Sequence, residues 1–171
     1  MTKPSGKETS NAERGVTLEC VEDFAARLRP AARLIGVDAG TKTLGLALSD
    51  QTRTIASPFS VLKRTKFTKD AAQLLEIAAE HRIAGFVLGL PTNLDGTAGP
   101  RVQATRAFAK NLNTLSDLPI LLWDERLSTV AAERSLLEAD TSRKRRAEVV
   151  DKVAAAIILQ GALDRMQAQK H

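Results

Sequence analysis

Three carboxylates stand at points where strands and helices would bring acidic groups together. Asp38 ends the apolar segment RLIGVDAG, Glu125 follows the apolar run ILLW, and Asp151 heads an apolar stripe in a long helical segment. A buried, unpaired charge is costly, so such carboxylates need a partner. Three of them at one site would repel one another unless a cation neutralised them, and oxygen ligands suit one or two Mg²⁺ or Mn²⁺ ions. Metal-assisted attack of water on a phosphodiester is the chemistry that this set predicts.

Neighbouring residues of a strand point to opposite faces, so only one of Asp124 and Glu125 can share a face with Asp38. We assign Glu125 to the metal and expect Asp124 to play a supporting role by capping the next helix or binding its own backbone. Gly40 would let the chain turn tightly and let a phosphate approach. The alternatives are an Asp38 that only shapes a hairpin and an Asp151 that is solvated and favoured by the helix dipole.

Other catalytic chemistries find little support. The only histidines are His81, within a helical stretch, and His171, and neither has a zinc-site or catalytic-triad signature. The single cysteine, Cys20, cannot form an internal disulfide or supply a multi-cysteine metal cage. The segment GVDAGTKT fails the spacing of a phosphate-binding loop because a threonine separates its glycine from its lysine.

The charge favours contact with a polyanion. The chain carries 25 Lys and Arg against 20 Asp and Glu, a net charge of +5. Basic residues gather in two places, and we assign backbone-phosphate contacts to Lys42, Arg126 and the link before the last helix, with a solvated link as the alternative. The link residues are Arg143, Lys144, Arg145 and Arg146, and the second cluster is Lys63, Arg64, Lys66 and Lys69.

The apolar pattern predicts an α/β fold that would position these groups. Three strands joined by short links form an antiparallel meander, and two more strands are reached through helices, which gives a mixed five-stranded sheet flanked by helices. This is the order of a ribonuclease-H-like fold. The predicted strands are 33–40, 44–50, 55–64, 83–91 and 120–123, and the predicted helices are 68–82, 101–112, 127–140 and 147–166.

The sequence divides into residues 1–30, a flexible N-terminal extension with a short helix near 19–29, and residues 31–171, the nuclease domain. No apolar stretch approaches the length of a membrane span, and the first residues have no apolar core of a signal peptide. We therefore expect a cytoplasmic protein without a membrane partner.

Four blocks of the sequence resemble the YqgF family, the Holliday-junction-resolvase-like proteins also described as precursor ribosomal RNA nucleases. They are GVDAGTKTLGLALSD at 36–50, VLGLPTNLDGTAGPR at 87–101, DERLST at 124–129 and RKRRAEVVDKVAAAIILQGALD at 143–164. The resemblance spans about 33–165 and implies a ribonuclease-H-like fold.

The resemblance places the family's catalytic positions on Asp38, Glu125 and Asp151. It also implies that Asn93 and Asp95 belong to a loop beside the site, where they would contact substrate, although NLDG is also a plain turn sequence. Thr43 departs from the family, many of whose members carry a basic residue there, and the departure weakens one phosphate contact.

The leading functional hypothesis is a metal-dependent endonuclease that hydrolyses phosphodiester bonds of structured nucleic acid, and the resemblance favours processing of the precursor 16S rRNA 5′ end. Cleavage of branched DNA as a Holliday junction resolvase is the alternative. A symmetric junction needs two active sites, so a homodimer would favour the resolvase, whereas a monomer would suffice for RNA processing. A non-catalytic nucleic-acid-binding module is a second alternative. A phosphotransferase of the sugar-kinase and actin type is disfavoured because it needs two domains.

Overall fold

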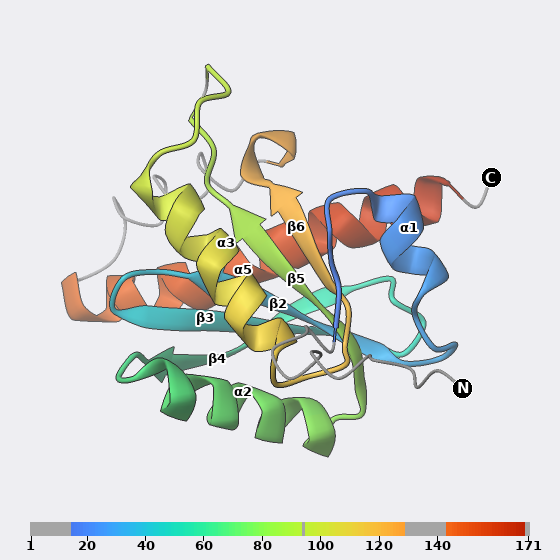
Figure 1. The fold of residues 1–171 in the computed structure, drawn as a ribbon, viewed down its shortest axis with the longest axis horizontal. Helices are drawn as coiled ribbons and strands as arrows, with labels where there is room; N and C mark the ends of the chain where they lie inside the picture. Colours follow the sequence, from blue (N-terminus) through green and yellow to red (C-terminus); the bar gives the residue numbers. More distant parts are fainter. Residues whose placement is uncertain (1–14, 94, 129–142, 170–171) are drawn as a thin grey trace, which may run out of the picture.

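The computed structural model describes residues 15–93, 95–128 and 143–169, and for 143–148 it describes the backbone alone (Figure 1). Its centre is a sheet of six strands in the order β1-β6-β5-β2-β3-β4. The predicted α/β architecture with a mixed sheet is confirmed. The prediction of five strands was wrong.

The meander consists of β2 (Arg33–Ala39), β3 (Thr43–Ser49) and β4 (Ala56–Lys63), which pair antiparallel in sequence order. Most residues of β2 and β3 are buried because helices cover both faces of the sheet at these strands. The short link between them sets Asp38 opposite Gly45.

Two crossover units follow the meander. Helix α2 (Phe67–Glu80) leads to β5 (Ile83–Leu90), and α3 (Pro100–Asn113) leads to β6 (Ile120–Asp124). Strand β5 pairs parallel with β2 and with β6, as helical crossovers require. The carboxyl ends of β2, β5 and β6 therefore meet at one edge of the sheet.

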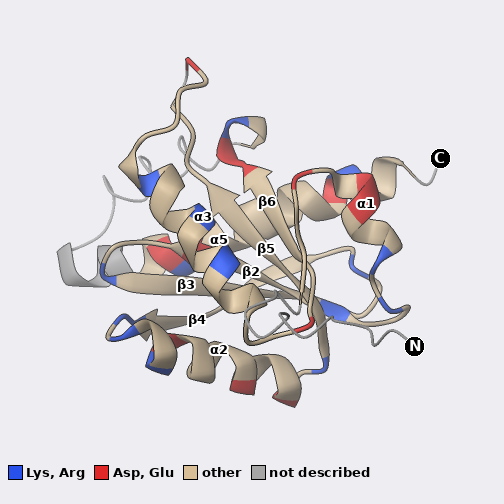
Figure 2. Ribbon diagram, in the orientation of Figure 1, with Lys and Arg blue, Asp and Glu red and all other residues tan. Residues whose placement is uncertain are grey.

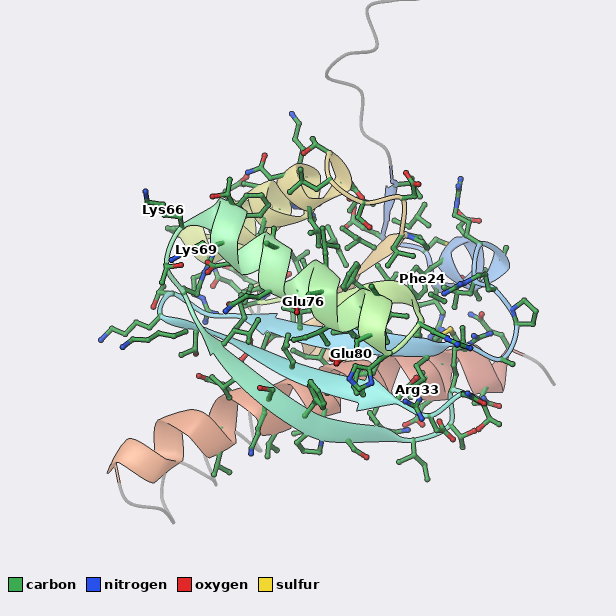
Figure 3. All side chains as sticks on the ribbon, turned by 90° about the horizontal axis from the view of Figure 1, so that it is seen from below. Phe24, Arg33, Lys66, Lys69, Glu76 and Glu80 are labelled. Atoms are coloured by element: carbon green, nitrogen blue, oxygen red, sulfur yellow. The ribbon has the colours of Figure 1, made fainter. Side chains whose placement is uncertain are left out.

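Helices cover both faces of this sheet. Helices α2 and α3 pack on one face, and α5 (Arg143–Ala168) packs on the other, so the sheet lies between α2 and α5 (Figure 3). Alternation along each strand supplies an apolar layer to each side. Within the described ranges, no helix combines the length and the apolar character that crossing a membrane requires.

The sixth strand comes from the segment predicted as an extension. Strand β1 (Thr17–Leu18) pairs parallel with Ile120–Leu121 of β6, and α1 (Val21–Ala26) follows it. Phe24 is fully buried, and a Cβ added to Gly85 of β5 would lie 3.0 Å from its ring. Residues 15–28 therefore complete the sheet and the α5-side core of the domain that we predicted to begin at residue 31.

The last helix begins earlier than predicted. The basic residues 143–146 form the first turn of α5 and are not a link, because the chain is already helical at Arg143. Most of the helix predicted at 127–140 lies outside the described residues. Its first position, Leu127, instead ends the short 3₁₀ helix η2 (Glu125–Leu127).

Truncation of Phe24 tests whether this N-terminal segment belongs to the core. We expect Phe24→Ala to lower the free energy of unfolding by about 3–5 kcal/mol, since it removes a buried aromatic ring and leaves a cavity. Denaturant unfolding measures the change, and Arg27→Ala, an exposed neighbour, is the control. Equal stability of the two variants would show that the segment adds nothing to the core.

The turn between β3 and β4 makes a pH-dependent contribution to the stability of the fold. Asp50 accepts hydrogen bonds from the Thr52 hydroxyl and from the backbone N–H groups of Ile55 and Thr54, which lower its pKa to about 2. An unfolded Asp titrates near 3.9, so this stabilisation is fully present above that pH and is lost as pH falls toward 2.

We therefore expect the stability difference between wild type and Asp50→Ala to be constant above about pH 5 and to shrink between about pH 4 and 2. Denaturant midpoints measured across this range test it. A difference that stayed constant down to pH 2 would contradict the assignment.

Candidate metal-binding site

Helix α5 touches the sheet at glycines. A Cβ atom added to Gly45 of β3 would lie 2.1 Å from the carbonyl oxygen of Asp151, and one added to Gly89 of β5 would lie 2.4 Å from Cδ1 of Ile158. Any larger residue would push the helix away. These glycines therefore set how close α5 can come to the strands that carry acidic residues.

Asp38 faces this helix. A Cβ added to Gly36, two residues earlier in β2, would meet Leu159 of α5 at 2.7 Å. Residues two apart in a strand share a face, so the side chain of Asp38 points to the α5 side of the sheet. Only 5% of Asp38 is exposed. It is thus a buried acidic residue at the carboxyl end of a central strand.

Asp151 lies beside Asp38. Gly45 is the cross-strand partner of Asp38, and a Cβ added to Gly45 would lie 3.1 Å from the Cβ of Asp151. The hydroxyl of Thr43 donates a hydrogen bond to Oδ2 of Asp151 and so orients this carboxylate. Thr43, which sequence reasoning treated only as a lost phosphate contact, therefore positions a candidate metal ligand.

Glu125 reaches the same face from the other side. It is 8% exposed and begins η2, directly after β6. A Cβ added to Gly89 would lie 2.7 Å from its Oε2, and Gly89 follows Leu88, the β5 partner of Val37 in β2. Glu125 therefore projects over the strand that neighbours Asp38, toward α5.

Asp124 has the other orientation. Its carboxylate binds the guanidinium of Arg126 at 2.7 Å and accepts the Arg126 backbone N–H at 2.9 Å, so it caps η2. The hydrogen bond from Arg126 lowers the pKa of Asp124. Figure 2 shows acidic and basic residues side by side at the end of β6. The two adjacent carboxylates thus diverge as strand alternation requires.

The oxygen donors on the α5 face fit a hard divalent cation. Asp38, Glu125 and Asp151 come from three elements at one edge of the sheet, but within the described chain no three acidic, cysteine or histidine residues lie close enough together to hold a metal ion. Asp151 is engaged with Thr43. The arrangement is a set of converging carboxylates that a cation would draw together, because Mg²⁺ binds through few carboxylates and keeps several waters.

The turn after Asp38 is held by two arginines that sequence reasoning did not connect with it. Arg64 donates to the carbonyl oxygen of Gly40 at 2.6 Å, and Arg101 donates to that of Ala39 at 3.3 Å. The N–H of Gly40 in turn donates to the carbonyl oxygens of Asp38 and Thr43. These contacts fix the backbone beside the candidate ligand. No local sequence signal indicates them, because their partners are backbone groups distant in the sequence.

The basic residues after β4 have two different roles. Arg64 is structural, since it also pairs with buried Asp70 and lies over the ring of Phe108. Lys66 and Lys69 stand at the amino end of α2, with their side chains directed away from the sheet (Figure 3). The lysines, and not Arg64, are the members that can meet an approaching polyanion.

The loop between β5 and α3 projects beyond the sheet (Figure 1). Within it, Asn93 donates to the Thr97 hydroxyl at 2.9 Å, and Asp95 accepts from the Thr97 hydroxyl and N–H at 2.7 and 2.9 Å. The hydrogen bond from the Thr97 hydroxyl lowers the pKa of the Asp95 carboxyl group. Both predicted contact residues thus stabilise the turn of their own loop, and their contact with substrate stays a prediction.

The predicted phosphate-binding residues lie in three different parts of the structure. Lys42 is exposed in the β2–β3 turn, and Arg126 is exposed beside Glu125 while it pairs with Asp124. Arg143, Lys144, Arg145 and Arg146 begin α5 and thus precede Asp151 by about two turns, but their side chains are outside the description.

Residues 32–165 match the family described as "RuvX: Holliday junction resolvase". A protein of Paracoccus denitrificans (strain Pd 1222) is 62% identical over 149 residues, 87% of this chain and 94% of its own length. One of Cereibacter sphaeroides (strain ATCC 17029) is 64% identical over 146 residues, covering 85% and 91%. Both are named "Putative pre-16S rRNA nuclease".

Among solved structures, the fold resembles RuvC of T. thermophilus, determined in complex with a Holliday junction substrate. The TM-score is 0.51 at 14% identity, covering 79% of this chain and 96% of RuvC. The chain thus has an α/β fold with a mixed sheet, similar to that of RuvC. The chain belongs to the RuvX family, which confirms the resemblance to YqgF proteins, and it is a hydrolase of phosphodiester bonds.

A methyl group at Gly45 tests the close contact that places Asp151. We expect Gly45→Ala to force α5 outward, to lower stability by about 2–3 kcal/mol and to abolish nuclease activity. Thermal unfolding and cleavage assays measure both. Gly99→Ala is the matched control, because its added Cβ would stay 3.8 Å from its nearest neighbour, in ordinary contact. Full activity of Gly45→Ala would contradict this geometry.

Proposed function

We propose that this chain is a metal-dependent endonuclease that processes the precursor of 16S rRNA at its 5′ end, in the cytoplasm. The observation that carries the proposal is the gathering of Asp38, Glu125 and Asp151 on the α5 face of the sheet, at the carboxyl ends of β2 and β6. The substrate follows from the names of relatives that are 62–64% identical over most of their length.

Asp38, Glu125 and Asp151 would hold one or two Mg²⁺ or Mn²⁺ ions through carboxylate oxygens. When bound, such ions activate water and stabilise the leaving oxygen of an in-line displacement. Thr43 orients the carboxylate of Asp151, while Arg64 and Arg101 keep the backbone beyond Asp38 in place. The chain's own part in the reaction is therefore to present fixed oxygen donors around a scissile phosphate.

Cations around the site would hold the substrate strand. Lys42 and Arg126 lie in the turns that follow β2 and β6, one on each side of the carboxylates. We assign the same role to Arg143, Lys144, Arg145 and Arg146 from their sequence alone. Phosphate contacts fix the position of a nucleic acid strand without reading its sequence.

Cleavage of four-way DNA junctions is the second candidate. It is favoured by the description of the family and by the shared fold with a resolvase solved on its junction. Symmetric cleavage needs two active sites, so a homodimer would support this activity, whereas a monomer suffices to trim RNA.

The test compares wild type with Asp38→Asn on a labelled precursor 16S rRNA fragment and on a four-way DNA junction, with Mg²⁺, Mn²⁺ or a chelator. We expect RNA cleavage that needs a divalent ion and falls by about 100-fold or more in Asp38→Asn, because the variant loses a charged metal ligand. Asp50→Asn is the control, since it removes a carboxylate in the distant β3–β4 turn.

Three results would redirect the proposal. Cleavage of the junction alone would replace RNA processing by junction resolution. Cleavage by Asp38→Asn at the wild-type rate would refute the metal site. Binding of both substrates without cleavage under any metal condition would indicate a nucleic-acid-binding module.

A further inference from the structure

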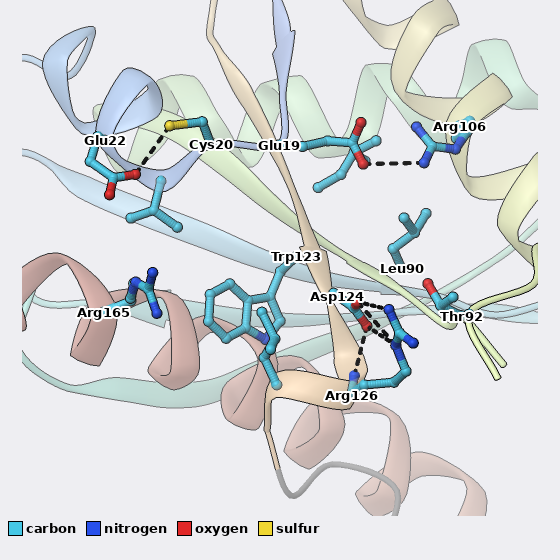
Figure 4. A pocket seen from close by; sticks show the side chains of 14 residues that line it. Glu19, Cys20, Glu22, Leu90, Thr92, Arg106, Trp123, Asp124, Arg126 and Arg165 are labelled. Carbon is cyan, nitrogen blue, oxygen red and sulfur yellow. Dashed lines mark hydrogen bonds and ion pairs between the residues drawn. The ribbon is translucent and has the colours of Figure 1, made fainter. Parts of the chain in front are cut away.

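A pocket opens where the edge of β6 loses its neighbour. Strand β1 covers only Ile120 and Leu121, and the chain then turns away at Glu19 toward α1. The remaining residues of β6, up to Asp124, border a pocket of about 590 Å³ (Figure 4). This volume lies within the range of sites that bind small molecules and cofactors.

Three guanidinium groups reach this pocket from separate elements. Arg106 comes from α3, Arg126 from η2 and Arg165 from α5, and Figure 4 shows them on different sides of it. Leu90 and Trp123 add an apolar wall. The pocket thus combines three guanidinium groups, which suit phosphate oxygens, with apolar surface and with the carboxylates of Glu19, Glu22 and Asp124.

Two of the three arginines are held by ion pairs. Arg106 binds Glu19 at 3.2 Å with 43% and 61% of the two side chains exposed, and Arg126 binds Asp124 at 2.7 Å with 38% and 26% exposed. The exposed Arg106–Glu19 pair contributes little to stability, so a phosphate can replace Glu19 beside Arg106 at little cost. The carboxylates also offer acceptors for the amino groups of a nucleobase.

The position of the pocket ties it to the candidate metal site. Asp124 and Arg126 are the chain neighbours of Glu125, and they line the pocket while Glu125 points to the α5 face. The pocket therefore begins at the two residues that flank Glu125 in the chain.

We propose that this pocket binds one unpaired nucleotide of the substrate strand, adjacent to the scissile phosphate. The proposal rests on the nuclease function and deepens it: Arg106 and Arg165 become substrate-binding residues, and the site selects strands with an unpaired nucleotide at the cut. A base inside a continuous duplex is stacked and paired and cannot enter such a pocket.

The chain carries its own reporters for a test. Trp123 is its only tryptophan and Cys20 its only cysteine, and both line this pocket. The fluorescence of Trp123 and the rate at which N-ethylmaleimide alkylates Cys20 therefore report on the pocket without any added label. The fluorescence and the alkylation rate are both measured on the wild-type protein in the presence of a chelator, so that binding is observed without cleavage of the RNA.

The probes are a short blunt-ended RNA duplex and the same duplex with an unpaired overhang. We expect only the duplex with the overhang to change the fluorescence of Trp123. At saturation the overhang should also cover Cys20 and slow its alkylation by about 10-fold or more. Arg106→Ala should weaken overhang binding about 10-fold and spare the blunt duplex, since it removes a charge-assisted contact to the unpaired nucleotide.

Lys110→Ala is the matched control, because it removes one exposed positive charge from the same helix without touching the pocket. Equal responses to the two duplexes, or equal behaviour of Arg106→Ala and Lys110→Ala, would overturn the pocket assignment. These outcomes are independent of the cleavage test on Asp38→Asn. The pocket can therefore fail while the nuclease function stands, and the reverse.

Discussion

The candidate site depends on how closely one helix approaches a sheet. Helix α5 meets β2, β3 and β5 at Gly36, Gly45 and Gly89, where a single methyl group would overlap the helix or its side chains. Side chains at these three positions would hold α5 farther from the strands and would carry Asp151, about two turns into the helix, away from Asp38. Absence of side chains at three positions thus decides where Asp151 lies.

Much of this arrangement could be predicted from sequence because it follows from periodicity. The apolar runs located all five longer strands, and alternation along β6 separated Asp124 from Glu125 correctly. The same rule places Asp38 on the α5 side of β2, whereas the position of Asp151 depends on the approach of α5 to Gly45. Their roles as metal ligands stay predictions.

What sequence could not indicate depends on contacts between distant residues. Strand β1 is two residues long, too short for any period to reveal, and it exists because β6 offers it an edge. The basic residues before Asp151 suggested a link, but helix propensity and continuity with α5 make them helical. Thr43, Arg64 and Arg101 act on groups that only the fold brings near.

The pairing of β1 with β6 also constrains when the protein can fold. Thr17 lies opposite Ile120, about a hundred positions later, and the helix bearing Asp151 follows later still. Pairing of such distant segments is slow because the intervening chain must first be closed into a loop. During synthesis, the early strand must wait for a late partner, and the carboxylates cannot meet before α5 has emerged. If Asp151 is a metal ligand, as we propose, nuclease activity can begin only after α5 has been synthesised.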